Sequence, residues 1–230
     1  MKIILSDLIN PEIEYYLKEK GLEIIKTKPF CNENNSVLMH PDIQCFSDKN
    51  SFFTYSNLKE YYSLYIPQII VSEHSLESKY PGDVRFNVFK AENYIFCNIK
   101  HTDNKLLSYL KNHYNIINVN QGYSNCSSLC LGKMTIATSD KGMEKVFNEN
   151  GFKTIFIDNK NIILKGYSNG FIGGSALKLN DEIVFFGSIQ KTEYKKLTSF
   201  LKENEVKYKD FDFPLEDYGS AVLFENTHPQ

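Results

Sequence analysis

Residues 122–131 read GYSNCSSLCL, and two later segments of the chain repeat this pattern. Residues 170–179 read GFIGGSALKL, and residues 217–224 read DYGSAVLF. In the register that aligns their serines, the residues just before the serine correspond: Cys126, Gly174 and Gly219. Each segment places a polar turn ahead of a short apolar run, which is typical of a strand that follows a tight turn. The recurrence predicts a repeated structural unit.

A second recurring feature is an apolar run that ends in a polar residue and leads into an amphipathic stretch of about three turns. The runs end at Ser6, Ser47, Asn98, Ser139 and Ser188. Asn10 followed by Pro11, and Asp140 in a later unit, are typical of helix starts. Five strand–helix–strand units in 230 residues average about 46 residues each.

Five such units predict one α/β domain over residues 1–230, in the form of a closed, pseudo-symmetric five-bladed α/β propeller. We expect helices on the outside and apolar strands along a central channel. The strands expected to line the channel contain Ile3, Ile43, Ile95, Ile136 and Val184. A doubly wound parallel sheet is the alternative, because alternating strands and helices alone would also predict it.

The composition is that of an ordinary globular protein, with 42% hydrophobic, 14% aromatic and 23% charged residues. A net charge of -2 and a single arginine, Arg85, provide no field that would hold a polyanion, which argues against nucleic acid and anionic membranes as partners. No apolar run suits a signal peptide or a membrane span, so we expect a cytoplasmic protein. The five cysteines lack a CxxC pair and predict neither a disulfide framework nor a zinc ribbon. A functional cysteine would act as a thiol.

The five-fold repetition and the short Gly-Ser turns resemble the pentein superfamily of guanidino-group-modifying enzymes. That superfamily includes arginine deiminase, agmatine deiminase, dimethylargininase and the amidinotransferases. The chain is most similar to small bacterial pentein-like proteins with His-Pro-Asp and Gly-Tyr-x-x-Cys-Ser segments. The resemblance implies a thiol-dependent hydrolase or transferase that acts on a small guanidino or amidino compound and needs neither a metal nor an organic cofactor.

His40-Pro41-Asp42 matches the family's His-x-Asp element. Pro41 favours an extended conformation at His40, and a period of two would then place His40 and Asp42 on one face. The resemblance implies that His40 moves protons and that Asp42 binds the substrate cation. The alternative is a surface turn in which Asp42 caps a local amide and His40 is solvated.

Two cysteines of the third unit are candidate nucleophiles. Cys130 lies where a family Gly-Gly-x-x-x-Cys ending places its nucleophile, whereas Cys126 lies in a polar turn that offers donors to a thiolate. In a strand both would share a face with Ser128. Cys126 ranks first, because the leucines beside Cys130 favour a buried core thiol there, and a structural role for both is the alternative. The remaining cysteines lie in or beside apolar strands and are predicted core residues: Cys31, Cys45 and Cys97.

Glu216 and Asp217 precede a glycine turn similar to the family's Glu-Gly-Gly element, whose carboxylate holds a guanidinium. The alternative is that this pair of acidic residues belongs to an ordinary surface turn. Arg85 is the one residue able to bind a substrate carboxylate in a bidentate manner. The family's enzymes carry Glu, His and Cys in that chain order, with the cysteine in the last unit. In this chain the same order of Glu, His and Cys is found around a closed ring if the chain termini are circularly permuted by two blades relative to those enzymes.

The resemblance gives a geometric expectation: His40, Asp42, one of the two cysteines and one acidic residue of the last unit converge at one mouth of the channel. In such a pocket the acidic residues should raise the pKa of His40, and its imidazolium should lower the pKa of the thiol.

The alternative function is a non-catalytic module of the same fold that binds a protein or a small molecule. An exposed apolar patch would favour a protein partner, whereas a deep polar pocket would favour an enzyme. The residues expected in such a patch are Tyr61, Tyr62, Tyr65 and Ile66.

Overall fold

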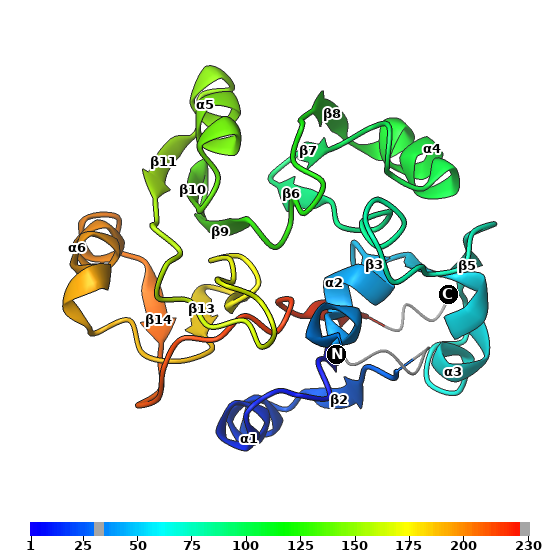
Figure 1. The fold of residues 1–230 in the computed structure, drawn as a ribbon, viewed down its shortest axis with the longest axis horizontal. Coiled ribbons are helices and arrows are strands. Elements are labelled where there is room, and N and C mark those ends of the chain that lie inside the picture. Colours follow the sequence, from blue (N-terminus) through cyan, green and yellow to red (C-terminus); the bar gives the residue numbers. More distant parts are fainter. Residues whose placement is uncertain (30–34, 226–230) are drawn as a thin grey trace.

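The computed structural model of the protein describes residues 1–29 and 35–225, and these form five three-stranded sheets arranged in a ring (Figure 1). The sheets, each given from the channel outward, are β15(Val222–Phe224)-β1(Lys2–Leu5)-β2(Glu23–Lys26), β3(Cys45–Ser47)-β4(Phe52–Thr54)-β5(Ile70–Val71), β6(Phe89–Ala91)-β7(Tyr94–Cys97)-β8(Asn115–Asn118), β9(Ser128–Gly132)-β10(Thr135–Thr138)-β11(Lys153–Phe156) and β12(Ala176–Leu179)-β13(Glu182–Phe185)-β14(Lys207–Lys209). The predicted five-bladed propeller is confirmed, and the open parallel sheet is excluded.

Every blade has the same internal order. The inner and middle strands pair antiparallel, and the middle and outer strands pair parallel. A helix joins the middle to the outer strand, as a parallel pair requires, and these helices lie on the outside of the ring (Figure 1). They are α1(Pro11–Glu19), α3(Lys59–Ser63), α4(Asn104–His113), α5(Lys141–Glu149) and α6(Lys195–Glu203).

The ring closes where the two ends of the described chain meet. The first blade takes its inner strand, β15, from the end of the chain, and Lys2 pairs with Phe224. Three shorter 3-10 helices and one further helix complete the fold: η1(Ser36–Met39), η2(Ser56–Leu58), η3(Thr192–Tyr194) and α2(Pro41–Gln44). No helix among the described residues is long and apolar enough to cross a membrane.

The predicted helix starts at Asn10 and Asp140 are confirmed. The side chain of Asn10 accepts a hydrogen bond from the Glu12 amide at 2.9 Å, and that of Asp140 accepts one from the Met143 amide at 2.8 Å. Each cap satisfies a backbone donor that the first turn of a helix leaves free.

The strands predicted to line the channel are instead the middle strands. Ile3, Ile95, Ile136 and Val184 lie fully buried in β1, β7, β10 and β13, and Ile43 lies in the short helix α2. A continuous apolar run marks a strand covered on both faces, and here that is the middle strand, which lies between two neighbours and under a helix. The inner strands can carry polar side chains, because one face of them borders the channel.

Ser47, the polar residue that ends the second apolar run, also lies one strand away from the position that its counterparts occupy in the other blades. Ser47 ends β3, an inner strand, whereas the middle strand of that blade is β4. The error arises because Cys45 and Phe46 are as apolar as a middle strand, although they belong to the edge of the channel.

Candidate functional site

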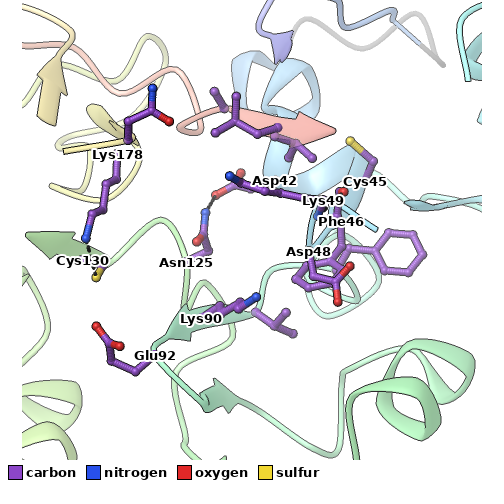
Figure 2. A pocket seen from close by; sticks show the side chains of 17 residues that line it. Asp42, Cys45, Phe46, Asp48, Lys49, Lys90, Glu92, Asn125, Cys130 and Lys178 are labelled. Atoms are coloured by element: carbon purple, nitrogen blue, oxygen red, sulfur yellow. Dashed lines mark hydrogen bonds between the residues drawn. The ribbon is translucent and has the colours of Figure 1, made fainter. Parts of the chain in front are cut away.

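A cavity of about 400 Å³ lies inside the ring, against inner strands of all five blades. The polar and charged residues among those that line it are Asp42, Ser47, Asp48, Lys49, Lys90, Glu92, Asn125, Cys130, Lys178 and Asn180. Figure 2 shows how these side chains border the cavity from several blades. Lys49, Glu92 and Asn180 are exposed, in turns between inner and middle strands, whereas Asp42 is buried and lies just before β3. The cavity therefore runs from a solvent-exposed end to a buried end at Asp42 and Asn125.

Cys126, Asp42 and His40 meet at this buried end. The Cys126 thiol donates to Asp42 Oδ2 at 2.9 Å, and one ligand atom from each of the three residues lies within 4.8 Å of the others. The Asn125 amide donates to the same Oδ2 at 2.9 Å. Asp42 and Asn125 line the cavity, and the Cys126 thiol contacts the Asp42 carboxylate without lining the cavity itself.

Asp217 completes the cluster from the segment between β14 and β15. Its Oδ1 lies 3.8 Å from His40 Nδ1, and its two oxygens accept the Gly219 amide at 2.9 Å and the Phe171 amide at 2.8 Å. Gly174 also contacts this carboxylate so closely that a Cβ there would collide with it. The glycine-containing turns at residues 170–174 and 217–219 thus hold Asp217 at a fixed position against His40.

The aligned turn residues form one continuous ladder around the site. The Gly174 amide donates to the Cys126 carbonyl at 2.9 Å, and the Ser220 amide donates to the Gly174 carbonyl at 2.9 Å. Gly219 has a φ of +75° and lies against His40, where a Cβ would collide with it. Glycine is required there both for the left-handed backbone and for the close approach. The register deduced from the serines corresponds to this physical contact between blades.

Asn87 is a site residue that the sequence did not indicate. Its amide donates to Cys126 Sγ at 3.1 Å, and its Oδ1 accepts the Asn125 backbone amide at 2.8 Å. Asn87 lies just before the inner strand β6, and its position ahead of an inner strand, as for Cys126 ahead of β9, was the available signal. The side chain fixes both the thiol and the turn that carries it.

Local structure brings His40 and Asp42 together differently from the prediction. His40 is extended, with a φ of -72° and a ψ of 128°, but Pro41 begins the helical turn α2, so no strand places Asp42 beside it. Cys126 likewise lies in a turn before β9, which begins at Ser128. The expectation that Cys126 and Cys130 share a strand face is therefore wrong.

Burial controls the protonation of the cluster. It lowers the pKa of His40 to about 4, although Asp42 and the Asp217 backbone act in the opposite direction. It raises the pKa of the Cys126 thiol well above 9.0, and the nearby Asp42 and Asp217 carboxylates raise it further. The predicted shifts of both groups are therefore wrong in direction, because the desolvation of a buried charge outweighs its interactions with neighbouring groups.

The two carboxyl groups are shifted by the same cause. Burial raises the pKa of Asp217 to about 7, against the opposing effect of its two backbone donors, and it raises the pKa of Asp42. At neutral pH the His40 imidazole is uncharged, so its approach to Asp217 is not an ion pair. Burial thus favours the uncharged forms of the thiol, the imidazole and both carboxyl groups.

Two buried polar atoms in the cluster have no hydrogen-bond partner among the described residues: His40 Nδ1 and Asp42 Oδ1. Buried polar groups are nearly always paired, so such atoms mark a place where a ligand or water belongs. The His40, Asp42 and Cys126 ligand atoms also have the types and the spacing that a metal such as zinc accepts.

The other predicted site residues lie apart from the cluster. Cys130 lines the cavity in β9, with its Sγ 3.9 Å from Lys178 Nζ. Glu216 accepts a hydrogen bond from the Tyr218 hydroxyl at 2.7 Å. Arg85 forms an ion pair with Glu77 at 3.1 Å and does not line the cavity.

The remaining sequence expectations concern the core. Cys45 and Cys97 are buried, as predicted, and Cys31 lies outside the described residues. Tyr62 and Ile66 are also buried, with exposed fractions of 0% and 1%. The exposed apolar patch that would favour a protein partner is therefore not formed by that group of residues.

Comparison with known proteins places the chain. A family model described as "Family of unknown function (DUF6873)" matches residues 4–222. The chain belongs to this family. No curated protein matches the sequence.

Solved structures share the fold of this DUF6873 member. Dimethylarginine dimethylaminohydrolase from Pseudomonas aeruginosa, a Cys-to-Ser mutant complexed with citrulline, superposes with a TM-score of 0.54 at 8% identity, covering 92% of this chain and 91% of that one. The amidinotransferase SxtG from Microseira wollei, of the saxitoxin biosynthetic pathway, gives 0.56 at 12% identity, with 92% and 88% covered. The inosamine-phosphate amidinotransferase of Streptomyces griseus gives 0.56 at 9% identity, with 95% and 80% covered. The DUF6873 chain therefore has the pentein fold.

Proposed function

We propose that this DUF6873 protein is a thiol-dependent hydrolase or transferase acting on a guanidino or amidino compound, with Cys126 as its nucleophile. The observation that carries the proposal is the pair of unpartnered buried atoms, His40 Nδ1 and Asp42 Oδ1, beside a thiol that contacts the same Asp42 carboxylate. A guanidinium carries several N–H donors and a positive charge, which such a carboxylate-rich pocket lacks. The similar folds of enzymes whose names state amidino transfer or dimethylarginine hydrolysis support the same class.

The substrate cation would change the protonation of the cluster. With a guanidinium against Asp42 and Asp217, the carboxylates become the stable forms, because an opposite charge within a few ångströms favours ionisation. The same cation would stabilise a thiolate at Cys126, and ionised carboxylates would stabilise an imidazolium at His40. The high thiol pKa and low imidazole pKa of the free protein keep the site unreactive until a cation enters.

The chemistry then follows from the three side chains. The Cys126 proton moves to His40, the sulfur bonds to the planar amidino carbon, and the C–N bond to the leaving amine breaks as that amine takes the proton from His40. An amidino group remains on the sulfur. Water or an acceptor amine, deprotonated by His40, then attacks that carbon, the C–S bond breaks, and the proton returns to Cys126. Asp42 and Asp217 hold the amidino group in place through these steps.

The experiment is a turnover assay of the full chain with a panel of guanidino and amidino compounds, measuring ureido product, released ammonia or amine, and amidino transfer to added amines. Cys126→Ala should abolish turnover, and the matched variant Cys130→Ala, which changes the second cavity thiol, should retain it. Retained turnover in Cys126→Ala would assign the chemistry to another group. A wild-type protein that is silent on the panel, and whose Cys126 stays inert to a haloacetamidine, would overturn the proposal.

A further inference from the structure

Lys178 presents an ammonium to the cavity with no counter-charge. It lies half-buried in the inner strand β12 and lines the cavity, and its Nζ lies 3.9 Å from the Cys130 thiol. No carboxylate of the described residues lies within ion-pair distance of it. A thiol is a weak acceptor and neutralises nothing, because burial raises the pKa of Cys130.

The other lysines of the cavity are accounted for. Lys90 donates to the Tyr114 hydroxyl at 2.9 Å, and Tyr114 in turn donates to the Asp48 carboxylate at 2.8 Å. Lys49 forms an ion pair with Glu225 at 3.3 Å. Among the described residues, Lys178 is thus the cavity lysine whose ammonium contacts only a thiol and retains donors for a ligand.

The cavity therefore has two poles, the carboxyl group of Asp42 and the ammonium of Lys178. Figure 2 shows Asp42 and Asn125 near its centre and Lys178 with Cys130 at one side. Glu92 lies on the same side as Lys178 in this view, but it is exposed in a turn, so solvent screens its charge. A ligand with a cation at one end and an anion at the other would match both poles.

We propose that the substrate is a guanidino or amidino acid, whose carboxylate or phosphate binds Lys178 while its guanidinium binds at Asp42. The assignment of the guanidinium end rests on the proposed function above. The anionic end rests on Lys178 alone, since Arg85, the one side chain suited to bidentate capture, lies outside the cavity and is paired with Glu77. An ammonium binds either anion as a point charge, so the choice between carboxylate and phosphate is left to measurement.

The test uses probe compounds that differ only in the acidic group: 4-guanidinobutyrate, 3-guanidinopropyl phosphate and propylguanidine. Turnover is measured as kcat/KM, and binding as the shift in melting temperature of the full chain. The variants are Lys178→Met, which keeps an apolar stem, Lys178→Arg, which keeps the charge, and Lys207→Met, an exposed lysine of the outer strand β14, as the matched control.

We expect the wild type to prefer an acid over propylguanidine by about 10- to 100-fold, the usual loss when one charged hydrogen bond is removed. Lys178→Met should abolish this preference by lowering kcat/KM for the acidic probe while leaving kcat/KM for propylguanidine unchanged. Lys178→Arg and Lys207→Met should keep most of the preference. The preferred acid identifies the anion. Turnover of all three probes at similar rates would overturn this inference and leave the proposed function standing. If no probe is turned over, a Lys178-dependent melting shift with the acids alone supports it, and equal or absent shifts overturn it.

Discussion

The contact between the Asp42 carboxylate and the Cys126 thiol makes a test of the electrostatics of the site. At 2.9 Å, two full negative charges repel each other by about 6 kcal/mol at an effective dielectric of 20. Burial raises the pKa of Asp42, which favours its uncharged form, so this value is an upper bound. A quarter of it still lowers the thiol pKa by about one unit when the charge is removed. Asp42→Asn should therefore make Cys126 more acidic.

The size of the kinetic effect follows from thiol chemistry. Each unit by which the pKa falls gives about ten times more thiolate, but nucleophilicity falls with a Brønsted slope of about 0.4–0.5, so the net gain is about three- to fourfold per unit. Alkylation of Cys126 by neutral iodoacetamide at pH 7 should then become at least about threefold faster. Alkylation by cationic 2-chloroacetamidine should gain much less, because the same substitution removes the carboxylate that attracts it.

The assay compares the two reagents on one protein, so that the opening of the buried site cancels in their ratio. Peptide mapping by mass spectrometry, in a Cys130→Ala background, isolates the label on Cys126. Asp48→Asn is the control, because Asp48 also lines the cavity but is held by the Tyr109 and Tyr114 hydroxyls. The ratio of cationic to neutral rates should fall about threefold in Asp42→Asn and stay constant in Asp48→Asn. A ratio unchanged in Asp42→Asn would refute the electrostatic reasoning.

Three further outcomes are expected. Gly219→Ala should lower the free energy of unfolding by about 2–4 kcal/mol in urea titrations, because Gly219 has a positive φ and a Cβ there would collide with His40. Gly21→Ala, at a similar φ but with open space around it, should cost only about 1–2 kcal/mol. Equal losses would contradict the contact with His40. Asn87→Ala should slow Cys126 alkylation and cost about 1–3 kcal/mol, because it removes a donor that lowers the thiol pKa and an acceptor for a buried amide; an unchanged alkylation rate would argue against that role. Asp217 has a folded pKa of about 7 against an ordinary 3.8, so its contribution to stability is full below pH 3.8 and is lost as the pH rises through 7. In thermal melts, Asp217→Asn should therefore show a smaller fall in melting temperature between pH 4 and 8 than the wild type. An identical fall would show that this carboxyl does not titrate in that range.

Much of the fold follows from the sequence because it is built from local and repeated signals. Asn10, Pro11 and Asp140 indicate helix starts through chemistry that acts within one turn, and the apolar runs that precede the helices follow from short-range periodicity. The aligned serines also gave the correct register between Cys126, Gly174 and Gly219, because each junction meets its neighbour in the ring in the same way.

The order of strands within a blade was not available from the same signals. Hydrophobicity reports how thoroughly a strand is covered and not which neighbour covers it, so the fully buried middle strands were taken for the channel strands. In the same way, His40-Pro41-Asp42 is compatible with a strand or a helical turn, and only the tertiary structure shows that Pro41 begins a helical turn.

The sequence by itself determined the number of blades, two helix starts and the candidate residue types for the site: one imidazole, two thiols and three carboxyl groups. Tertiary structure decided which of them meet. Cys126 rather than Cys130 contacts Asp42, Asp217 rather than Glu216 faces His40, and Asn87 joins from a blade whose repeat is barely recognisable. Tertiary structure also decided the direction of the pKa shifts, because the desolvation that lowers the pKa of His40 and raises that of Cys126 depends on every blade that closes over them, and no local pattern encodes that sum.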